Sequence, residues 1–448
     1  MPQAAAAAIA TAAGIAKGTL AYKAIYVAVN VAFVVGTQVL VSALNKPPKP
    51  GDRKESLRGE VMPRPVNFGR TLAGSSVVYD DVASKTRWQV HVHNHGRVQN
   101  LIERRFGGKA YAVDPSGQLL PFSRFQDSPY AEFRDGSEDQ PPSVLMRTPD
   151  LRKGPSAAPG WTDDHRLRGL AYTVIRAPSV KAEKFSEIYP EGRPPVPTIV
   201  GDFGAPFDPR SGQRAFTRNG ALLFAWFLTH PLGGRLPENR INWDAFALAA
   251  DAADRLSYEI AGSWLADEAP KVAQANMLAA LDAAMWTGPD GRVRLDLGEW
   301  RDPQVTLTHD HVLQVQSLSA GAEEGEAVTE QVVKFIDRDR DYSEVEEVAA
   351  SIDGPVYEPK VADLTYCPTK AQALRLGRRI FARETARWRL DATLNLAGLR
   401  LINQRFAVVH LPDFGLHHEA MELDSWGFSP ATGQVVARLR SVRPEDFA

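Results

Sequence analysis

The stretch Asn219–Arg255, NGALLFAWFLTHPLGGRLPENRINWDAFALAADAADR, decides the fold of the chain around it. Ala221–Thr229 is apolar almost all round, the pattern of a helix that is buried on every side. Pro231 ends this helix, because proline lacks an amide hydrogen and clashes with the preceding turn. We therefore expect a buried helix, followed by a tight loop at Gly233–Gly234.

Two more helices and a strand follow this loop. Asn242 is a good N-cap for the second helix, and the acidic stretch ending at Pro270 predicts the start of the third. After a turn at Gly288–Gly291, a short alternating strand is expected. The residues expected to face inward are Trp243, Phe246, Ala247 and Ala250, then Leu278, Leu281 and Met285, then Val293, Leu295 and Leu297. Nothing in this unit suggests catalysis.

The length of 448 residues allows two to four domains, at roughly 150 residues per domain. The net charge of −2 implies no polyanionic partner through overall balance. A single cysteine, Cys367, excludes an intrachain disulfide framework and a cysteine-rich metal or iron–sulfur site.

We expect an α+β fold that is predominantly β and has four parts. They are an apolar N-terminal helical segment with its linker (1–50), a first β-rich domain (51–215), a helical domain (216–300) and a second β-rich domain (301–448). The stretch near 135–166 is rich in glycine, proline and charges, and predicts a long loop insertion. The cleanest strand starts at Trp388 and alternates apolar and polar residues up to Leu396.

The N-terminal segment contains an uncharged run of 21 residues, Ala24–Leu44, which includes Val31 and Val35. As a helix it would be about 30 Å long, enough to cross a bilayer. A signal peptide is disfavoured, because the start has no charged region and the apolar run is too long. A membrane anchor and an apolar helix buried inside an assembly are the two remaining interpretations.

Three histidines, His91, His93 and His95, alternate along a predicted strand and would share one of its faces. That spacing makes them candidate zinc ligands. The other interpretation is a strand that ends at a hairpin, and we expect neither a metal nor a cofactor.

Three arginines, Arg375, Arg379 and Arg383, recur at helical spacing in a helix that the capping box Thr369–Gln372 opens. Such a basic row would suit DNA phosphates in a channel or the acidic surface of a partner. A solvated face, or ion pairs between subunits, is the alternative.

Catalysis needs groups that converge, and the sequence offers none that are recognisable. It lacks a Gly-x-Ser-x-Gly elbow, a His-Glu-x-x-His motif and a phosphate-binding glycine loop. Cys367 has no identifiable histidine partner and is expected to be buried and structural. We therefore expect a protein that is not an enzyme.

An ordered series of short motifs resembles phage tail-tip hub proteins, the family of the lambda-like tip attachment protein J and of hubs of other long-tailed phages and gene transfer agents. It covers most of residues 57–448, and best Gly169–Gly298. The chain has Asn219-Gly-Ala where the family usually has Asn-Pro-Ala, and Phe207 where tyrosine is common. The residues that carry the resemblance, the family-signature residues, are Gly169, Tyr172, Asp208, Pro209, Arg210, Gly212, Asn219, Trp226, Trp243 and Phe246.

The resemblance implies a homotrimer in which two β-barrel-like domains per copy build a ring continuous with the tail tube. Such a hub sits at the tail tip of the virion, binds the distal tail protein ring and surrounds the C-terminus of the tape-measure protein. It would close the tube and open it for DNA passage, with transient contacts to phage DNA and the host envelope. The sequence ends at Ala448, where many tip proteins continue, so receptor binding is expected on other tail-tip or fibre proteins.

Two functions from other classes remain as alternatives. Ala24–Leu44 alone would suit a membrane-anchored envelope protein with a β-rich soluble domain. His91, His93 and His95 would suit a metal-dependent hydrolase.

Overall fold

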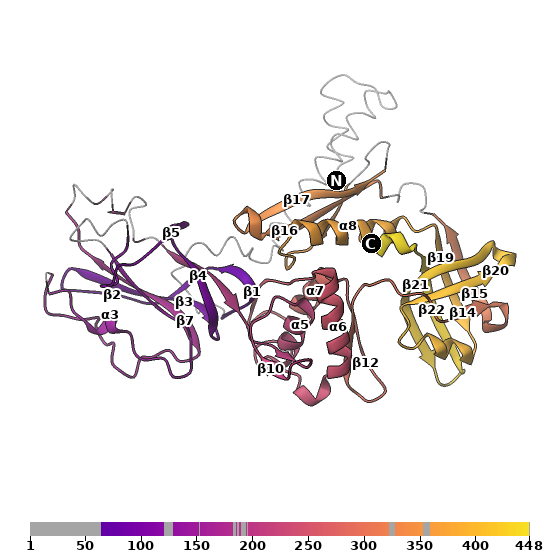
Figure 1. The fold of residues 1–448 in the computed structure, drawn as a ribbon, viewed down its shortest axis with the longest axis horizontal. Helices are drawn as coiled ribbons and strands as arrows, with labels where there is room; N and C mark the ends of the chain where they lie inside the picture. The colour runs from indigo at the N-terminus through magenta and orange to yellow at the C-terminus, as the bar shows by residue number, and fades with distance from the viewer. Residues whose placement is uncertain are drawn as a thin grey trace, which may run out of the picture. The chain divides into compact units, whose positions relative to one another are not determined.

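The computed structural model describes residues 64–120, 129–151, 153–181, 185, 188–189, 194, 196–321, 328–352 and 359–447. The structure is predominantly β, as predicted, with a group of helices in the middle of the chain (Figure 1). The apolar segment marked by Ala24, Val31, Val35 and Leu44 lies outside the described residues, and so does its linker. Within the described ranges, no helix combines the length and the apolar character needed to span a membrane.

Two antiparallel sheets are built mainly from residues 65–203. The five-stranded sheet has the order β11-β1-β8-β4-β5, and the four-stranded sheet has the order β2-β3-β7-β6. The strands are β1 (Pro65–Ala73), β2 (Ser76–Ala83), β3 (Thr86–His95), β4 (Val98–Phe106), β5 (Lys109–Tyr111), β6 (Tyr130–Arg134), β7 (Leu170–Pro178), β8 (Pro197–Phe203) and β11 (Gly262–Leu265). Because β11 comes from the helical part of the chain, it ties that part to the first sheet.

The stretch 135–166 consists mostly of turns and contains a short helix, α3 (Val144–Arg147), that its composition did not predict. The Ser143 hydroxyl caps this helix by accepting the amide of Met146 at 3.2 Å. The carboxylate of Glu132 on β6 accepts the amide of Leu145 at 2.8 Å. The insertion is therefore fixed to the sheet by side-chain bonds.

The helical part contains α5 (Gly220–Thr229), α6 (Trp243–Leu256) and α7 (Pro270–Leu281). The predicted caps are present: Asn219 accepts the amide of Leu222, and Asn242 accepts that of Ala245. α5 is buried almost all round, as its composition predicts. It is followed by the tight loop at Gly233–Gly234, whose amides bond back to His230 and Phe227.

The inward faces of the next two helices differ from the prediction. α6 buries Phe246 and Ala250, but its other buried residues are Ala249, Ala252 and Ala253, while Trp243 in the first turn is partly buried against the core and also contacts Phe207. Met285 does not extend the face of α7. Asp282 ends that helix in the left-handed conformation, and Met285 lies in a strand, β12 (Ala284–Thr287), paired with β13 (Val293–Asp296).

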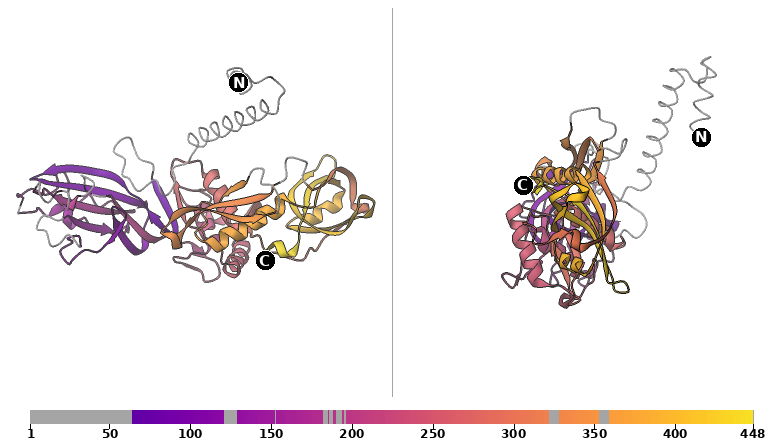
Figure 2. Two further views of the ribbon diagram at one scale, coloured as in Figure 1. Left: turned by 90° about the horizontal axis from the view of Figure 1, so that it is seen from above. Right: turned by 90° about the vertical axis from the view of Figure 1, so that its right-hand side faces the viewer.

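The core of the helical part is completed by residues far away in the sequence. A three-stranded sheet, β17-β16-β18, contributes Val333 and Phe335, and α8 contributes Ala373 and Leu376. α8 lies along β16 and β17 (Figures 1 and 2), and a side chain at Gly377 would collide with Val333 and Ala349. The elements are β16 (Glu330–Asp337), β17 (Ser343–Ser351), β18 (Lys360–Asp363) and α8 (Lys370–Glu384).

A six-stranded sheet with the order β14-β20-β21-β22-β19-β15 forms a separate core from the rest of the C-terminal region. The span 301–448 therefore contributes to two cores. The strands are β14 (Thr306–Thr308), β15 (Val312–Ala320), β19 (Trp388–Leu394), β20 (Phe406–Leu411), β21 (Leu416–Ser429) and β22 (Gln434–Ser441).

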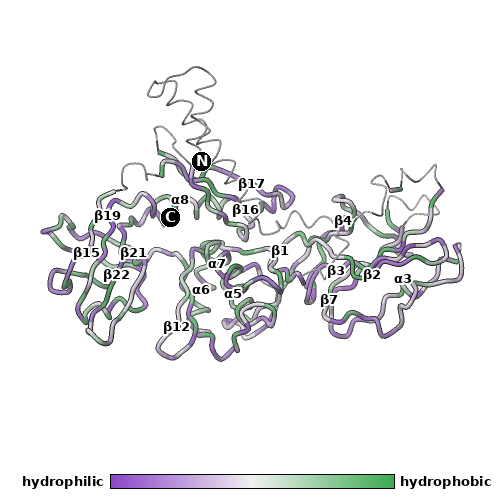
Figure 3. Tube along the Cα trace, turned by 180° about the vertical axis from the view of Figure 1, so that it is seen from behind, coloured by the Kyte–Doolittle hydropathy of each residue, from purple (hydrophilic) through white to green (hydrophobic). Residues whose placement is uncertain are grey.

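The alternation predicted for β19 is correct up to Leu394. Leu390, Ala392 and Leu394 are buried, whereas Leu396 is 58% exposed. Asn395 caps the short helix η6 (Leu396–Leu401) by accepting the amide of Ala397 at 2.9 Å, which turns the chain out of the sheet. Figure 3 shows the hydropathy of each residue along the trace.

The remaining short elements connect these units. They are β9 (Phe207–Asp208), β10 (Gln213–Arg214), η3 (Glu238–Arg240), η4 (His309–His311), η5 (Arg338–Arg340), η7 (Pro412–Phe414) and η8 (Pro444–Phe447).

Candidate functional site: a buried arginine–carboxylate network

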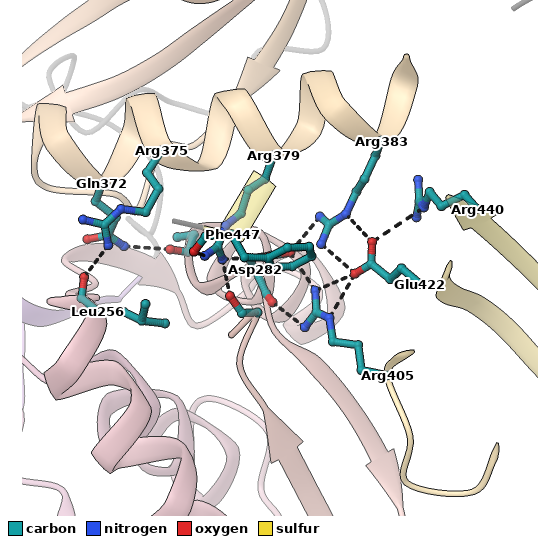
Figure 4. Close-up of polar contacts among 12 residues, drawn as sticks. Leu256, Asp282, Gln372, Arg375, Arg379, Arg383, Arg405, Glu422, Arg440 and Phe447 are labelled. Atoms are coloured by element: carbon teal, nitrogen blue, oxygen red, sulfur yellow. Dashed lines mark hydrogen bonds and ion pairs between the residues drawn. The ribbon is translucent and has the colours of Figure 1, made fainter. Parts of the chain in front are cut away.

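A buried cluster of charged side chains joins the helical part to the six-stranded sheet (Figure 4). Its two central carboxylates are Asp282, at the end of α7, and Glu422, on β21. The side chain of Asp282 is 7% exposed and that of Glu422 is 5% exposed. The arginines around them come from α8, from the loop before β20 and from β22: Arg379, Arg383, Arg405 and Arg440. We call this set the arginine–carboxylate network.

Asp282 binds three of these arginines. Its carboxylate lies 3.1 Å from Arg379, 2.7 Å from Arg383 and 3.2 Å from Arg405. Its backbone carbonyl also accepts from Arg405 at 3.1 Å. The left-handed conformation of Asp282 (φ 47°) ends α7 and turns both groups toward the arginines.

Glu422 is held by two guanidinium groups in a planar arrangement. Arg383 donates two hydrogen bonds to it, at 2.8 and 2.9 Å, and Arg405 donates one at 2.9 Å. Arg440 lies 3.7 Å away and pairs with Asp424. Such two-pronged contacts fix geometry more strongly than single charge pairs do.

Arg379 extends the network to the end of the described chain. It is 2% exposed, and it donates to the carbonyl of Gly298 and, at 2.8 Å, to the carbonyl of Phe447. A side chain at Gly298 would overlap the carboxylate of Asp282. Only glycine therefore allows this close approach.

The electrostatics explain why buried carboxylates are stable here. Burial opposes ionisation of Asp282, but Arg405 and Arg383 outweigh it and lower the pKa of Asp282 to about 2. Burial likewise opposes ionisation of Glu422, and Arg383 is the main group that keeps its pKa below the ordinary value. Both groups therefore carry their charge near neutral pH.

The three arginines predicted to form a basic row do share one side of α8, but they bind within the chain. Arg375 donates to the carbonyl of Leu256 at 2.7 Å, while Arg379 and Arg383 belong to the network. Burial leaves Arg379 no surface to offer DNA or a partner. The spacing thus indicated the face correctly, but not its carboxylate partners.

The capping box predicted at the start of α8 is wrong in its bonding. Thr369 is the N-cap but makes no side-chain cap bond. Gln372 instead reaches into the helical part, where it donates to the carbonyls of Glu259 and Ala280 and accepts the amide of Glu259. Burial of the Gln372 side chain explains this choice, because its amide must find partners there.

Several family-signature residues meet in a second charged cluster. Arg210 binds both carboxylate oxygens of Asp208, at 3.0 and 2.9 Å, and also Asp251 and Asp254 on α6. Asn219 donates to Asp254 at 2.8 Å while it caps α5. The hydrogen bonds from Arg210 are the main reason that the pKa of Asp208 is lowered. This cluster locks the loop from Asp208 to Asn219 onto α6.

The other family-signature residues have packing or turn positions. Tyr172 and Phe246 are fully buried. Trp226 lies against Trp264, with ring centroids 5.5 Å apart, and Trp243 lies against Phe207 at 5.0 Å. The turn glycines, Gly169 and Gly212, have φ values of +73° and +72°, and Pro209 lies in the same turn as Gly212.

The three histidines on β3 do not act as one group. His93 is fully buried, and its ring nitrogens contact the Gly74 carbonyl at 3.1 Å and the Thr173 hydroxyl at 2.8 Å. Burial lowers the pKa of His91 to about 3 and that of His93 to about 4. A bulge between Val92 and Asn94 also interrupts the pairing of β3 with β7. Among the described residues, no three His, Cys, Asp or Glu side chains are grouped as a metal ion would require.

Cys367 is buried and unpaired, and burial raises the pKa of its thiol to about 12. Its environment therefore disfavours the reactive thiolate.

The sequence analysis missed Asp282, Arg405, Glu422 and Arg440. Glu422 carried only a weak signal, its position between Met421 and Leu423, because Glu419 and Asp424 make the strand segment polar as well. Asp282 carried none, since a polar residue after a helix is ordinary. Their meeting depends on contacts across 140 positions of sequence, which no local pattern reveals.

Comparison with known proteins shows which proteins this chain resembles. Residues 275–402 match a family described as putative phage tail protein. No curated protein sequence matches the chain. The matched segment contains Asp282, Arg379 and Arg383 of the network.

Twenty-five chains of solved structures match the fold. A chain of the virion of a native gene transfer agent particle aligns with a TM-score of 0.56 and 15% identity, covering 94% of this chain and 97% of that one. A tail protein from Neisseria meningitidis MC58 aligns at 0.31 with 11% identity, covering 84% and 97%. The 43 kDa tail protein of prophage MuSo2 from Shewanella oneidensis aligns at 0.29 with 11% identity, covering 87% and 97%.

The resemblance to phage tail proteins is thereby confirmed. Through residues 275–402, the chain is related to the putative phage tail proteins. The family match of residues 275–402 supports a structural tail component.

Proposed function

We propose that this protein is the hub at the tip of a tail, which closes the distal end of the tail tube and opens it for DNA passage. The observation that carries this proposal is the alignment, along nearly the whole of both chains, with a chain of a gene transfer agent virion. The match of residues 275–402 to phage tail proteins supports it independently.

In the proposed hub, three copies of the chain form a ring, and β-rich bodies of each copy continue the tail tube. The distal tail protein ring lies above, and the C-terminus of the tape-measure protein ends inside. For Ala24–Leu44, which lies outside the described residues, we propose release toward the host envelope during DNA delivery. Other tail-tip or fibre proteins carry receptor recognition.

The arginine–carboxylate network suits a part that must bear load. It joins α8 to β21 through the bidentate Arg383–Glu422 contact, and α7 and β22 through further ion pairs. A hub that transmits force between the tube and the tip needs such rigid contacts between the elements of each chain. The same joint would be superfluous in a binding protein whose domains move freely.

The oligomeric state tests the proposal directly. Full-length protein purified without detergent should elute, by size-exclusion chromatography with light scattering, at three times the chain mass of 49.1 kDa. A monomer that requires detergent or lipid would contradict the hub and favour the membrane-anchored alternative.

Disruption of the gene provides a second test. Particles that lack the protein should show, by electron microscopy, tails without a closed tip, and they should fail to deliver DNA. Normal tips on such particles would overturn the proposal.

A further inference from the structure

His230, at the end of α5, fixes the loop that follows the helix. Its Nδ1 accepts the amide hydrogen of Leu232 at 3.0 Å. The indole of Trp264 on β11 donates to the carbonyl of the same residue, Leu232, at 2.8 Å. The His230 ring stands edge-on to Trp226 and Trp264, with centroids 4.8 and 5.4 Å away. Leu232 is therefore held from two sides by groups that surround one histidine.

A cavity of about 600 Å³ lies beside this histidine, between the loop and the ends of β3 and β7. His95, the last residue of β3, lines it from the opposite wall, and the Nδ1 atom of His95 is buried with no hydrogen-bond partner in the described part of the chain. The other charged side chains that face the cavity are Arg97, Glu138, Asp139 and Arg168. Arg97 pairs with Asp135 at 2.9 Å.

The bond to Leu232 defines the protonation state of His230. Because Nδ1 accepts a hydrogen, the neutral ring carries its proton on Nε2. Proton uptake would place a hydrogen on Nδ1, opposite the amide hydrogen of Leu232, and the bond would be lost. The charge would also be buried beside two indole rings and would face His95. Burial first, and His95 second, accordingly lower the pKa of His230 to about 4.

We propose that His230 is an acid-operated latch: proton uptake breaks its bond to the Leu232 amide, loosens Leu232 from Trp264 and widens the cavity toward His95. The backbone hydrogen bonds of Gly233–Leu236 keep the rest of the loop in place. The latch belongs to the chain itself and does not depend on the proposed tail function. Its closed form has a neutral His230, and its open form exposes a charged His230 to water.

The direction and size of the pH response follow from proton linkage. The closed form is favoured above the ordinary histidine pKa of 6.5 and is lost progressively as the pH falls toward 4. Between about pH 7.5 and about pH 4.5, the ratio of open to closed forms should rise roughly 70-fold. His91 and His93 lie in the core of the β-sheets, so their protonation affects global unfolding instead.

Tryptophan fluorescence of the full-length protein tests the latch, because two indoles contact His230. Acrylamide quenching should increase reversibly from pH 7.5 to 4.5, while the far-UV circular dichroism stays constant. His230→Asn keeps an acceptor for the Leu232 amide but does not titrate, so this variant should lose the transition. His165→Asn is the matched control. The exposed His165 ring lies beside Trp161, with ring centroids 5.1 Å apart, and its replacement should leave the transition unchanged.

A second variant tests the coupling across the cavity. His95→Gln removes the opposing charge, so the midpoint of the His230 transition should move to higher pH. Absence of a transition in the wild type, or its persistence in His230→Asn, would overturn the proposal. If His230→Asn does not fold at pH 7.5, an unchanged midpoint in His95→Gln would overturn it instead.

Discussion

At the scale of single residues, Asp282 is one of the two carboxylates that each pair with three arginines of the network. Replacing it with asparagine would leave Arg379, Arg383 and Arg405 with one carboxylate fewer in a buried site. Asp282→Asn should lower the free energy of unfolding by about 3–5 kcal/mol, the range for breaking a buried ion pair. Urea denaturation at pH 7 measures this loss. Asp413→Asn, at an exposed carboxylate, should change it by less than about 0.5 kcal/mol.

Gly298 provides a steric test of the same network. A β-carbon there would overlap Asp282 and crowd Arg379, so Gly298→Ala should destabilise the protein by about 2–3 kcal/mol. Gly427→Ala is the matched control, because nothing lies within 4 Å of its added carbon. Thermal unfolding of both variants makes the comparison, and equal melting temperatures would contradict the close approach.

The buried histidines of β3 predict a loss of stability in acid. Burial keeps the folded-state pKa of His93 at about 4, below the unfolded value of 6.5. Stability is therefore complete above pH 6.5 and falls as the pH drops toward 4, by about 2–3 kcal/mol for this residue at about pH 4.5. Urea denaturation at pH 7 and pH 4.5 measures it. His93→Gln should lose less between these two pH values than the wild type does.

At the scale of elements, the first turn of α8 bonds differently from a capping box. The buried side chain of Gln372 makes three hydrogen bonds to backbone groups, whereas the Thr369 side chain makes no cap bond. Gln372→Ala should cost about 3 kcal/mol, because it leaves buried backbone groups unsatisfied. Thr369→Ala should cost less than about 0.5 kcal/mol. If chemical denaturation shows a larger loss of stability for Thr369→Ala than for Gln372→Ala, the capping-box prediction would be correct after all.

Local sequence patterns correctly predicted the elements that are formed by neighbouring residues. Asn219 and Asn242 cap their helices as expected, because a side-chain oxygen next to free amides needs no distant partner. The alternation along β19 also follows from its own sequence. The inward face of α6 was predicted in part: Phe246 and Ala250 are buried and Trp243 packs against the core, whereas Ala247 is only partly buried. The turn at Gly288–Gly291 and the strand β13 were predicted correctly, with Val293, Leu295 and Leu297 buried. β12 was missed because Asp282, not a proline or glycine, ends α7.

At the scale of the whole molecule, the network was beyond the reach of sequence analysis. Arg379 and Arg383 were selected for their spacing, but their carboxylates lie on α7 and on β21. Charged residues in an amphipathic helix normally face water, and only the meeting of two distant elements buries them here. The family-signature residues were easier to find, because Asp208, Arg210 and Asn219 lie close together in the chain.

The C-terminal residues connect several units, and their removal should affect the whole molecule. The Phe447 carbonyl accepts from Arg379, and the Phe447 ring packs against Trp300 and Phe406. Phe447→Ala should lower stability by about 3 kcal/mol. Calorimetry should show a single transition at lower temperature. Two separated transitions would mean that the helical part and the six-stranded sheet unfold independently.

The order of the strands has a consequence for biosynthesis. β14 and β15 emerge from the ribosome before β16–α8, but their sheet partners, β20 and β19, are made only afterwards. The backbone groups of both strands therefore remain unpaired while the intervening segment is translated. Such unpaired strand edges favour pairing between nascent chains. We expect the yield of soluble protein to improve when translation is slowed by cooling or when a holdase chaperone is supplied.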